Sequence, residues 1–250
     1  MCYDLDARPP IPPISGAAGD GQDIVITASD GNRFSAYMSR SPQPKGAEVL
    51  IFPDVRGLHA FYKELALRFA DIGVPALAID YFGRTAGISP RDENFEYRTH
   101  VDQMQMPTFL NDVAAALAYL RDQNKTARAP FIVGFCRGGA LALLTGAENF
   151  DLLGIIAFYP GMSRQIPGSK GTVHEQASKI RCPVLGLFGG ADANIPATDV
   201  QKLDEQLAVA GVKHELVTYP GATHSFFDRR ATEFAEQSAD AWRRVQSFIT

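Results

Sequence analysis

The chain begins with two stretches in which apolar and polar residues alternate, on either side of the dipeptide Asp30-Gly31. Alternation with a period of two is the pattern of a strand with one buried face, and Asp-Gly is a strong turn signal between paired strands. The stretch from Gln22 to Arg40 therefore predicts an antiparallel hairpin at the start of a sheet. Before it, residues 1–20 carry four prolines and several small residues, which predicts an extended arm without regular structure.

From Glu48 onward the pattern changes to short, continuous apolar runs separated by amphipathic stretches. Such runs are typical of parallel strands buried on both faces, and the amphipathic stretches are typical of the helices that cover them. We expect one α/β domain over residues 1–250, with a mostly parallel twisted sheet and helices on both faces. The predicted strands lie within 48–53, 74–80, 130–135, 152–160, 182–189 and 215–220, and the predicted helices span 60–72, 108–123, about 139 onward, 197–210 and 231–248.

Residues 83–107 form a long, polar and proline-interrupted connection between two of these elements. Connections of this length usually serve as lids or binding loops, or else they are mobile surface segments. Both interpretations stay open from the sequence. In a parallel sheet, ligands bind outside the carboxyl ends of the strands, so the residues that directly follow each strand are the candidates for a site.

The charge balance narrows the class of partner. The chain carries 24 Lys and Arg residues against 28 Asp and Glu, a formal net charge of -4. This leaves no basic excess for binding nucleic acid or an anionic membrane surface. No apolar run reaches the roughly 20 residues that span a bilayer, and the first residues lack the basic and apolar regions of a secretory signal. We therefore expect a cytoplasmic protein with no nucleic-acid or membrane partner.

The three cysteines are odd in number and have no metal-ligand spacing, so neither a disulfide framework nor a metal site is predicted. One of them, Cys136, lies in the sequence Gly134-Phe135-Cys136-Arg137-Gly138, between a predicted strand and an Ala/Leu-rich helix. This is the G-x-C-x-G form of the nucleophile elbow, a sharp turn that requires small residues two positions before and after the nucleophile. The helix N-terminus would favour a thiolate. The alternative is an inert, buried cysteine in a glycine-rich turn.

Two later strand ends carry the partners that such a nucleophile needs. Asp192 follows the strand that ends at Gly189, and His224 follows the strand that ends near Tyr219. The order nucleophile, acid, histidine is the one that this kind of fold requires. We predict that His224 removes the proton of the Cys136 thiol and that Asp192 orients the imidazole. Taken singly, Asp192 could be a helix N-terminal aspartate and His224 a solvated loop residue.

The segments GFCRGG (134–139), GGADANIP (189–196) and YPGATHSFFD (219–228) resemble those of dienelactone hydrolases, and the similarity extends from about Gln22 to the C-terminus. The resemblance implies an α/β-hydrolase fold and a small, monomeric hydrolase. It also implies a small ester or lactone substrate, an enol-lactone from the breakdown of chlorinated aromatic compounds, and no metal or cofactor. The cysteine in place of the usual serine makes the resemblance fairly specific.

The resemblance also suggests roles for residues around the nucleophile. Asp54 stands where the family has a glutamate that contacts the resting thiol, although aspartate is one methylene shorter and a local pairing with Arg56 is the alternative. The backbone N–H groups of Val55 and Arg137 occupy the positions where this fold builds its oxyanion hole.

Arginines hold the substrate carboxylate in the family. Arg84 matches one of them, with Tyr81 in the same segment, and a solvated surface arginine is the alternative for Arg84. The second family arginine falls at Asp228, where the pattern breaks, and Arg229 or Arg230 would have to replace it. Because an acid at this position would repel an anionic substrate, the departure casts doubt on lactone acids as the natural ligand.

The predicted activity is attack of the Cys136 thiolate on an ester or lactone carbonyl, with an acyl-thioester intermediate that is hydrolysed with the help of His224. A broader carboxylesterase or thioesterase is the first alternative, and the missing second arginine favours it. Two alternatives from other classes are a non-catalytic binding protein with this fold and a thiol redox sensor that uses Cys136.

Overall fold

The computed structural model of the protein describes residues 7–12, 20–123 and 129–250. In these residues eight strands form one sheet in the order β1-β2-β4-β3-β5-β6-β7-β8. The hairpin predicted around Asp30-Gly31 is present. Its second strand, β2, is antiparallel to both β1 and β4, and all other neighbouring strands are parallel. The strands are β1 (Asp20–Thr27), β2 (Arg33–Arg40), β3 (Val49–Phe52), β4 (Ala76–Ile79), β5 (Phe131–Phe135), β6 (Gly154–Phe158), β7 (Val184–Gly189) and β8 (His214–Tyr219).

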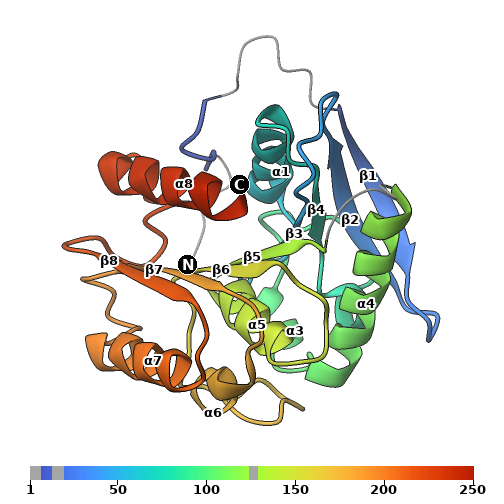
Figure 1. The fold of residues 1–250 in the computed structure, drawn as a ribbon. Coiled ribbons are helices and arrows are strands. Elements are labelled where there is room, and N and C mark those ends of the chain that lie inside the picture. The colour runs from blue at the N-terminus through green and yellow to red at the C-terminus, as the bar shows by residue number, and fades with distance from the viewer. Residues whose placement is uncertain (1–6, 13–19, 124–128) are drawn as a thin grey trace.

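Helices cover both faces of this sheet. Figure 1 shows α1 (Ala60–Asp71) and α8 (Ala235–Ile249) on one face, and α4 (Met106–Gln123), α5 (Arg137–Gly146) and α7 (Ala197–Val209) on the other. Every residue of the central strands β3 to β7 is buried, which explains their continuous apolar sequences. The predicted α/β-hydrolase fold is confirmed.

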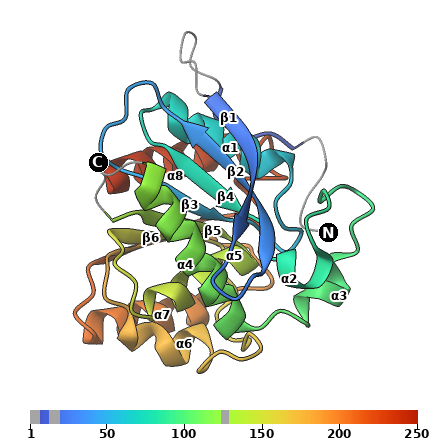
Figure 2. The same cartoon turned by 90° about the vertical axis from the view of Figure 1, so that its right-hand side faces the viewer.

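The connection from residue 83 to residue 107 is more ordered than the sequence indicated. It contains two short helices, α2 (Gly83–Ala86) and α3 (Tyr97–Val101), and Figure 2 shows α2 beside β2, whose first residues it contacts. A further short helix, α6 (Val173–Gln176), was also not predicted, although it begins with a capping box formed by Thr172 and Glu175. Helices of four or five residues are too short to give a periodic apolar pattern.

One buried ion pair fixes this connection to the sheet. The Arg91 guanidinium donates to Asp80 Oδ2 at 2.6 and 3.0 Å, and both side chains are almost fully buried. Arg91 also donates to the carbonyl groups of Gly87 and Ser89. Asp80 directly follows β4, so the pair holds residues 87–91 against the carboxyl end of the sheet.

Part of the predicted N-terminal arm lies along α1. The carbonyl of Ile11 accepts a hydrogen bond from Arg68 Nε at 2.9 Å, and Arg8 pairs with Glu64 at 3.1 Å. Ala7 and Ile11 pack against the core. The rest of the arm, residues 1–6 and 13–19, lies outside the described residues. Within the described part of the chain, no helix combines the length and apolar character needed to cross a membrane.

We expect Arg91→Met to destabilise the protein by about 3 kcal/mol, because it leaves the buried carboxyl of Asp80 without its cation. Urea unfolding measures the change. Arg164→Met is the matched control, since Arg164 pairs with Asp102 at 3.6 Å on a side chain that is 85% exposed, and it should cost no more than about 0.5 kcal/mol. Equal effects of the two substitutions would contradict an anchoring role for Arg91.

Candidate active site

Cys136 occupies a sharp turn between β5 and α5, as the elbow motif predicts. Its backbone has φ 53° and ψ -113°, a conformation that costs a non-glycine residue about 1–3 kcal/mol. The N–H of Cys136 donates to the carbonyl of Phe158 at 3.0 Å, and the carbonyl of Cys136 accepts from the N–H of Ala140 at 3.2 Å. The side chain is half-buried at the N-terminus of α5.

The two glycines of the motif are required by backbone contacts. A Cβ on Gly134 would lie 2.1 Å from the carbonyl oxygen of Gly138. A Cβ on Gly138 would lie 2.2 Å from the carbonyl oxygens of both Phe52 and Pro53, at the end of β3. Side chains of flexible neighbours could move aside, but these are main-chain atoms. The turn can therefore form only with glycine at both positions.

Asp192 and His224 are in direct contact. Asp192 Oδ2 lies 2.6 Å from His224 Nδ1, although the two residues are 32 positions apart in the sequence. The Asp192 side chain is fully buried, while the His224 side chain is 19% exposed. Asp192 Oδ1 accepts the N–H of Asn194 at 2.9 Å, which fixes the carboxylate in its loop. With Nδ1 engaged in this way, His224 can exchange a proton through Nε2.

Tyr159 contacts His224 and lies near Phe135, the residue before Cys136. It directly follows β6, the strand between β5 and β7, and its backbone φ is 37°. Its ring contacts the His224 imidazole, with centroids 4.9 Å apart, and lies 6.3 Å from the ring of Phe135, the neighbour of Cys136. The structure thus places Cys136, Asp192 and His224 after three parallel strands at the same edge of the sheet. Their joint action as a catalytic triad stays a prediction.

Comparison with known proteins identifies the family. Residues 34–250 match the family model described as "Dienelactone hydrolase family". This chain belongs to the dienelactone hydrolase family. It is 30% identical over 208 residues to the protein named "Putative carboxymethylenebutenolidase" of Methylorubrum extorquens. The aligned region covers 80% of this chain and 70% of the relative.

Two further comparisons agree with this membership. A protein of the same name from Synechocystis is 30% identical over 210 residues, 80% of this chain and 84% of the relative. The crystal structure described as a "Putative Dienelactone Hydrolase" from Klebsiella pneumoniae superposes with a TM-score of 0.81 at 25% identity, over 93% of this chain and 98% of the other. As a member of the dienelactone hydrolase family, the protein is a hydrolase.

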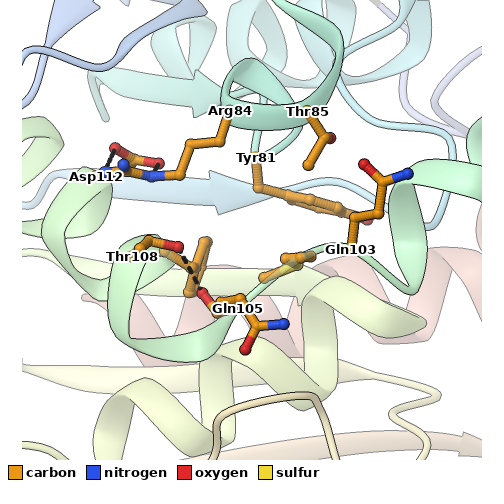
Figure 3. A pocket seen from close by; sticks show the side chains of 9 residues that line it. Tyr81, Arg84, Thr85, Gln103, Gln105, Thr108 and Asp112 are labelled. Atoms are coloured by element: carbon orange, nitrogen blue, oxygen red, sulfur yellow. Dashed lines mark hydrogen bonds and ion pairs between the residues drawn. The ribbon is translucent and has the colours of Figure 1, made fainter.

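Arg84, a predicted ligand of the substrate carboxylate, is engaged within the chain. Its guanidinium donates to Asp112 at 2.7 and 2.9 Å and to Asp30 at 2.7 and 3.2 Å. Figure 3 shows Arg84 and Asp112 at one side of a small hollow of about 20 Å³, which Tyr81 also lines. With a side chain that is 21% exposed and paired with two carboxylates, Arg84 is not the solvated surface arginine of the alternative interpretation. A contact of Arg84 with the substrate stays a prediction.

Tyr81 and Arg229, the other two predicted substrate contacts, lie in different settings. Tyr81 is buried, and its hydroxyl donates to the carbonyl of Asp54. It therefore holds the loop after β3. Arg229 is half-buried, and its backbone N–H donates to Asp228 Oδ1. Substrate contacts of both residues stay predictions.

Asp54 is buried in the loop after β3. Its Oδ1 accepts a hydrogen bond from the backbone N–H of Arg56 at 2.9 Å, so the local pairing considered for Asp54 is made with the main chain of Arg56. The same Oδ1 lies 3.6 Å from His59 Nε2. Its Oδ2 has no hydrogen-bond partner among the described residues. Contact with the Cys136 thiol stays a prediction.

The predicted oxyanion-hole residues Val55 and Arg137 are both half-buried beside this loop and the elbow. The Arg137 side chain donates to the carbonyl of Val101 at 3.0 Å, and the Arg56 guanidinium lies over the Tyr97 ring at 5.7 Å. The segment around α3 therefore rests on residues from both sides of the predicted hole. Among residues 7–12, 20–123 and 129–250, no three His, Cys, Asp or Glu side chains gather in a way that could hold a metal ion.

The sequence interpretation missed Tyr159 and treated Asp228 only as a break in the family pattern. The predicted strand 152–160 includes Tyr159, whereas the structure ends β6 at Phe158, so the sequence interpretation set the strand end too late to mark Tyr159 as a site candidate. Asp228 is buried, and its Oδ2 accepts the Tyr159 hydroxyl at 2.8 Å. No sequence pattern indicates this contact, since the two residues are 69 positions apart.

We expect Gly138→Ala to abolish hydrolysis and to destabilise the protein by about 2 kcal/mol or more, because the added methyl group forces the elbow away from β3. Thermal unfolding and ester turnover measure both effects. Gly161→Ala is the matched control, since nothing lies within 4 Å of a Cβ at that position. A Gly138→Ala protein with normal turnover would show that the close approach is dispensable.

Proposed function

We propose that the protein hydrolyses ester or lactone carbonyls through an acyl-thioester formed on Cys136. The observation that carries the proposal is the 2.6 Å contact between Asp192 and His224, made at the sheet edge where Cys136 follows β5. A carboxylate bound to Nδ1 fixes the histidine tautomer whose Nε2 accepts a proton. The elbow and the helix N-terminus favour the thiolate at the same edge.

The proposed reaction proceeds in two halves. His224 Nε2 takes the thiol proton, and the thiolate attacks the carbonyl carbon to form a C–S bond and a tetrahedral oxyanion, which the N–H groups of Val55 and Arg137 stabilise. The C–O bond then breaks, and the alkoxide takes the proton from His224. Water next gives a proton to His224 and attacks the thioester, the C–S bond breaks to release the acid, and the leaving thiolate takes the proton back from His224 to restore the thiol.

The family and its relatives support a lactone or ester as substrate. The relatives named carboxymethylenebutenolidase act, by that name, on a butenolide lactone, and we transfer this chemical class to the present protein. A thiolate leaves a tetrahedral intermediate more readily than most alkoxides do, so the mechanism suits activated esters and enol-lactones.

A broader carboxylesterase that prefers uncharged esters is the second candidate. It is favoured by the pairing of Arg84 with Asp30 and Asp112, and by the presence of Asp228 where the resemblance implies an arginine. Both features remove positive charge that a substrate carboxylate would need. The two candidates share the chemistry of Cys136 and differ in the charge of the substrate.

Cys136→Ala should lower kcat/KM for an activated ester by at least about a thousandfold, since it removes the nucleophile. Iodoacetamide should inactivate the wild type, with one carbamidomethyl group located on Cys136 by mass spectrometry. Cys182→Ala is the matched control. Burial raises the pKa of the Cys182 thiol to about 11, so this thiol should react slowly and its loss should leave inactivation unchanged. Hydrolysis that survives Cys136→Ala would end the proposal.

A matched pair of esters, one neutral and one carrying a carboxylate, tests the substrate charge. We expect a higher kcat/KM for the neutral ester, and we expect Arg84→Ala to change the ratio by less than about twofold. If Arg84 held the carboxylate, the substitution should instead cost the anionic ester about 10- to 100-fold. Arg229→Ala in the same assay reports on the other predicted contact.

A further inference from the structure

Two buried carboxyl groups belong to the surroundings of the proposed catalytic residues. Asp54, after β3, is 1% exposed, and Asp228, in the loop after β8, is 3% exposed. Burial, and after it the negative charge of Asp54, raise the pKa of Asp228. Two negative charges buried near each other are costly, so such a pair favours a state with one proton on it.

Tyr159 connects this pair to the histidine. Its hydroxyl donates to Asp228 Oδ2 at 2.8 Å, and its ring contacts the His224 imidazole at 4.9 Å. The Tyr159 side chain is fully buried and is also packed against the rings of Phe158 and Phe226. It therefore has little freedom to move independently of His224.

Asp228 also closes the loop that carries His224. The Asp228 N–H donates to the carbonyl of Ser225 at 3.3 Å, and the same carbonyl accepts the Arg230 N–H at 3.1 Å. Ser225, the residue after His224, has a φ of 63°, a conformation that the surrounding contacts must hold in place. Asp228 Oδ1 accepts the N–H of Arg229. Main chain and side chain of Asp228 thus both act on the His224 loop.

We propose that Tyr159 and Asp228 are positioning residues for the His224 imidazole, and that Asp228 does this as an uncharged carboxylic acid. The catalytic consequence rests on the proposed function, while the protonation state of Asp228 does not. No role for either residue is part of the triad chemistry described above.

The groups that face Asp228 support its uncharged form. They come from the loop after β3 (Asp54), from α1 (Tyr62), from the end of β6 (Tyr159) and from its own loop (His224). Burial first, and the charge of Asp54 second, raise the pKa of Asp228 to about 8, against the opposing effects of the Arg229 N–H, the Tyr159 hydroxyl and the charge of His224. At neutral pH the carboxyl therefore holds its proton.

Ionisation of Asp228 has a defined consequence for the site. The negative charges of Asp228, Asp54 and Cys136 all act on Tyr159, where burial and these charges raise the pKa of the phenol well above its usual value. Ionised Asp228 would be a second carboxylate beside Asp54. Its charge would disfavour the Cys136 thiolate and would repel Asp54, and this repulsion would disturb the contacts of Tyr159. We expect turnover to fall as the pH rises through about 8.

The same proton affects stability. Because the pKa of Asp228 is about 8 in the folded protein, against the ordinary value of 3.8 expected in the unfolded chain, the folded state holds the proton over the interval between these values. The stabilisation is full below about pH 4 and is lost as the pH rises through about 8. Asp228→Asn cannot titrate, so its Tm relative to wild type should rise from pH 5 to pH 8 and then level off. A carboxyl with an ordinary pKa would give a constant difference, which would overturn the uncharged acid.

The experiment compares Asp228→Asn, Asp228→Ala and Tyr159→Phe with the wild type. We expect Asp228→Ala and Tyr159→Phe to lower kcat/KM for a neutral ester by about tenfold or more at pH 7, since a small misplacement of a catalytic group is costly. Asp228→Asn keeps an acceptor for the Tyr159 hydroxyl, so it should retain most activity and lose the decline above pH 8.

Two controls make the outcome specific. Tyr219→Phe removes a hydroxyl that donates to Asp240 at 3.0 Å, a similar Tyr–Asp contact outside the site, and should leave turnover unchanged. Asp192→Asn should be almost inactive at every pH, because there the charge is needed. If Asp228→Asn were as slow as Asp228→Ala at pH 7, the uncharged acid would be wrong.

A readout that needs no substrate separates this inference from the proposed function. The proton between His224 Nδ1 and Asp192 should give a downfield NMR resonance. We expect this resonance to persist in Asp228→Asn and to broaden or shift in Asp228→Ala and Tyr159→Phe. An unchanged resonance and unchanged turnover in Tyr159→Phe would refute positioning. A wild type without esterase activity, but with the expected resonances and Tm differences, would refute only the proposed function.

Discussion

The site depends on the close approach of main-chain atoms where β3, β5 and α5 meet. Gly138 at the start of α5 lies so near the carbonyl groups of Phe52 and Pro53 that no Cβ fits between them. This contact determines the position of two parts of the site. It fixes the turn that presents Cys136, and it fixes the end of β3, from which the loop of Asp54 and Val55 begins. The nucleophile and one side of the predicted oxyanion hole therefore share a single rigid reference.

Tyrosine hydroxyl groups hold the loop after β3 from two directions. The N–H of Asp54 donates to the Tyr62 hydroxyl at 2.9 Å, and the carbonyl of Asp54 accepts from the Tyr81 hydroxyl. Both tyrosines are buried, so these hydrogen bonds are protected from water. A third tyrosine, Tyr159, has the corresponding role on the histidine side. Three buried tyrosines thus support the site from the core, each through one hydroxyl group.

The sequence predicted those features that follow from local pattern. The apolar run from Phe131 to Phe135 and the glycines around Cys136 predicted a strand and an elbow, because each requirement acts over a few residues. The order of Cys136, Asp192 and His224 predicted the shared edge, because parallel strands end on the same side. Helices α2 and α3 escaped prediction, since with four and five residues they are too short to show a periodic apolar face.

The direction of charged side chains was the weakest part of the sequence interpretation. Arg84 matched a family position, but nothing local shows that Asp112, 28 residues later, would bind it. Asp228 looked like a charge facing the substrate, whereas the structure buries it against Tyr159. Both differences arise from pairings between distant segments, and a one-dimensional pattern does not record which distant partner a long side chain reaches.

The pairing of Arg84 has a consequence for small anions in general. Asp112 belongs to the same chain, so it competes for the guanidinium as an intramolecular ligand, at an effective concentration of about a millimolar or more. Asp112 is also almost fully buried and keeps a second donor, Asn32 Nδ2 at 3.0 Å, so its carboxylate is already oriented for the arginine. A free carboxylate that reached Arg84 would have to displace this tethered competitor. Asp112 is therefore an intramolecular competitor for any anion that approaches Arg84.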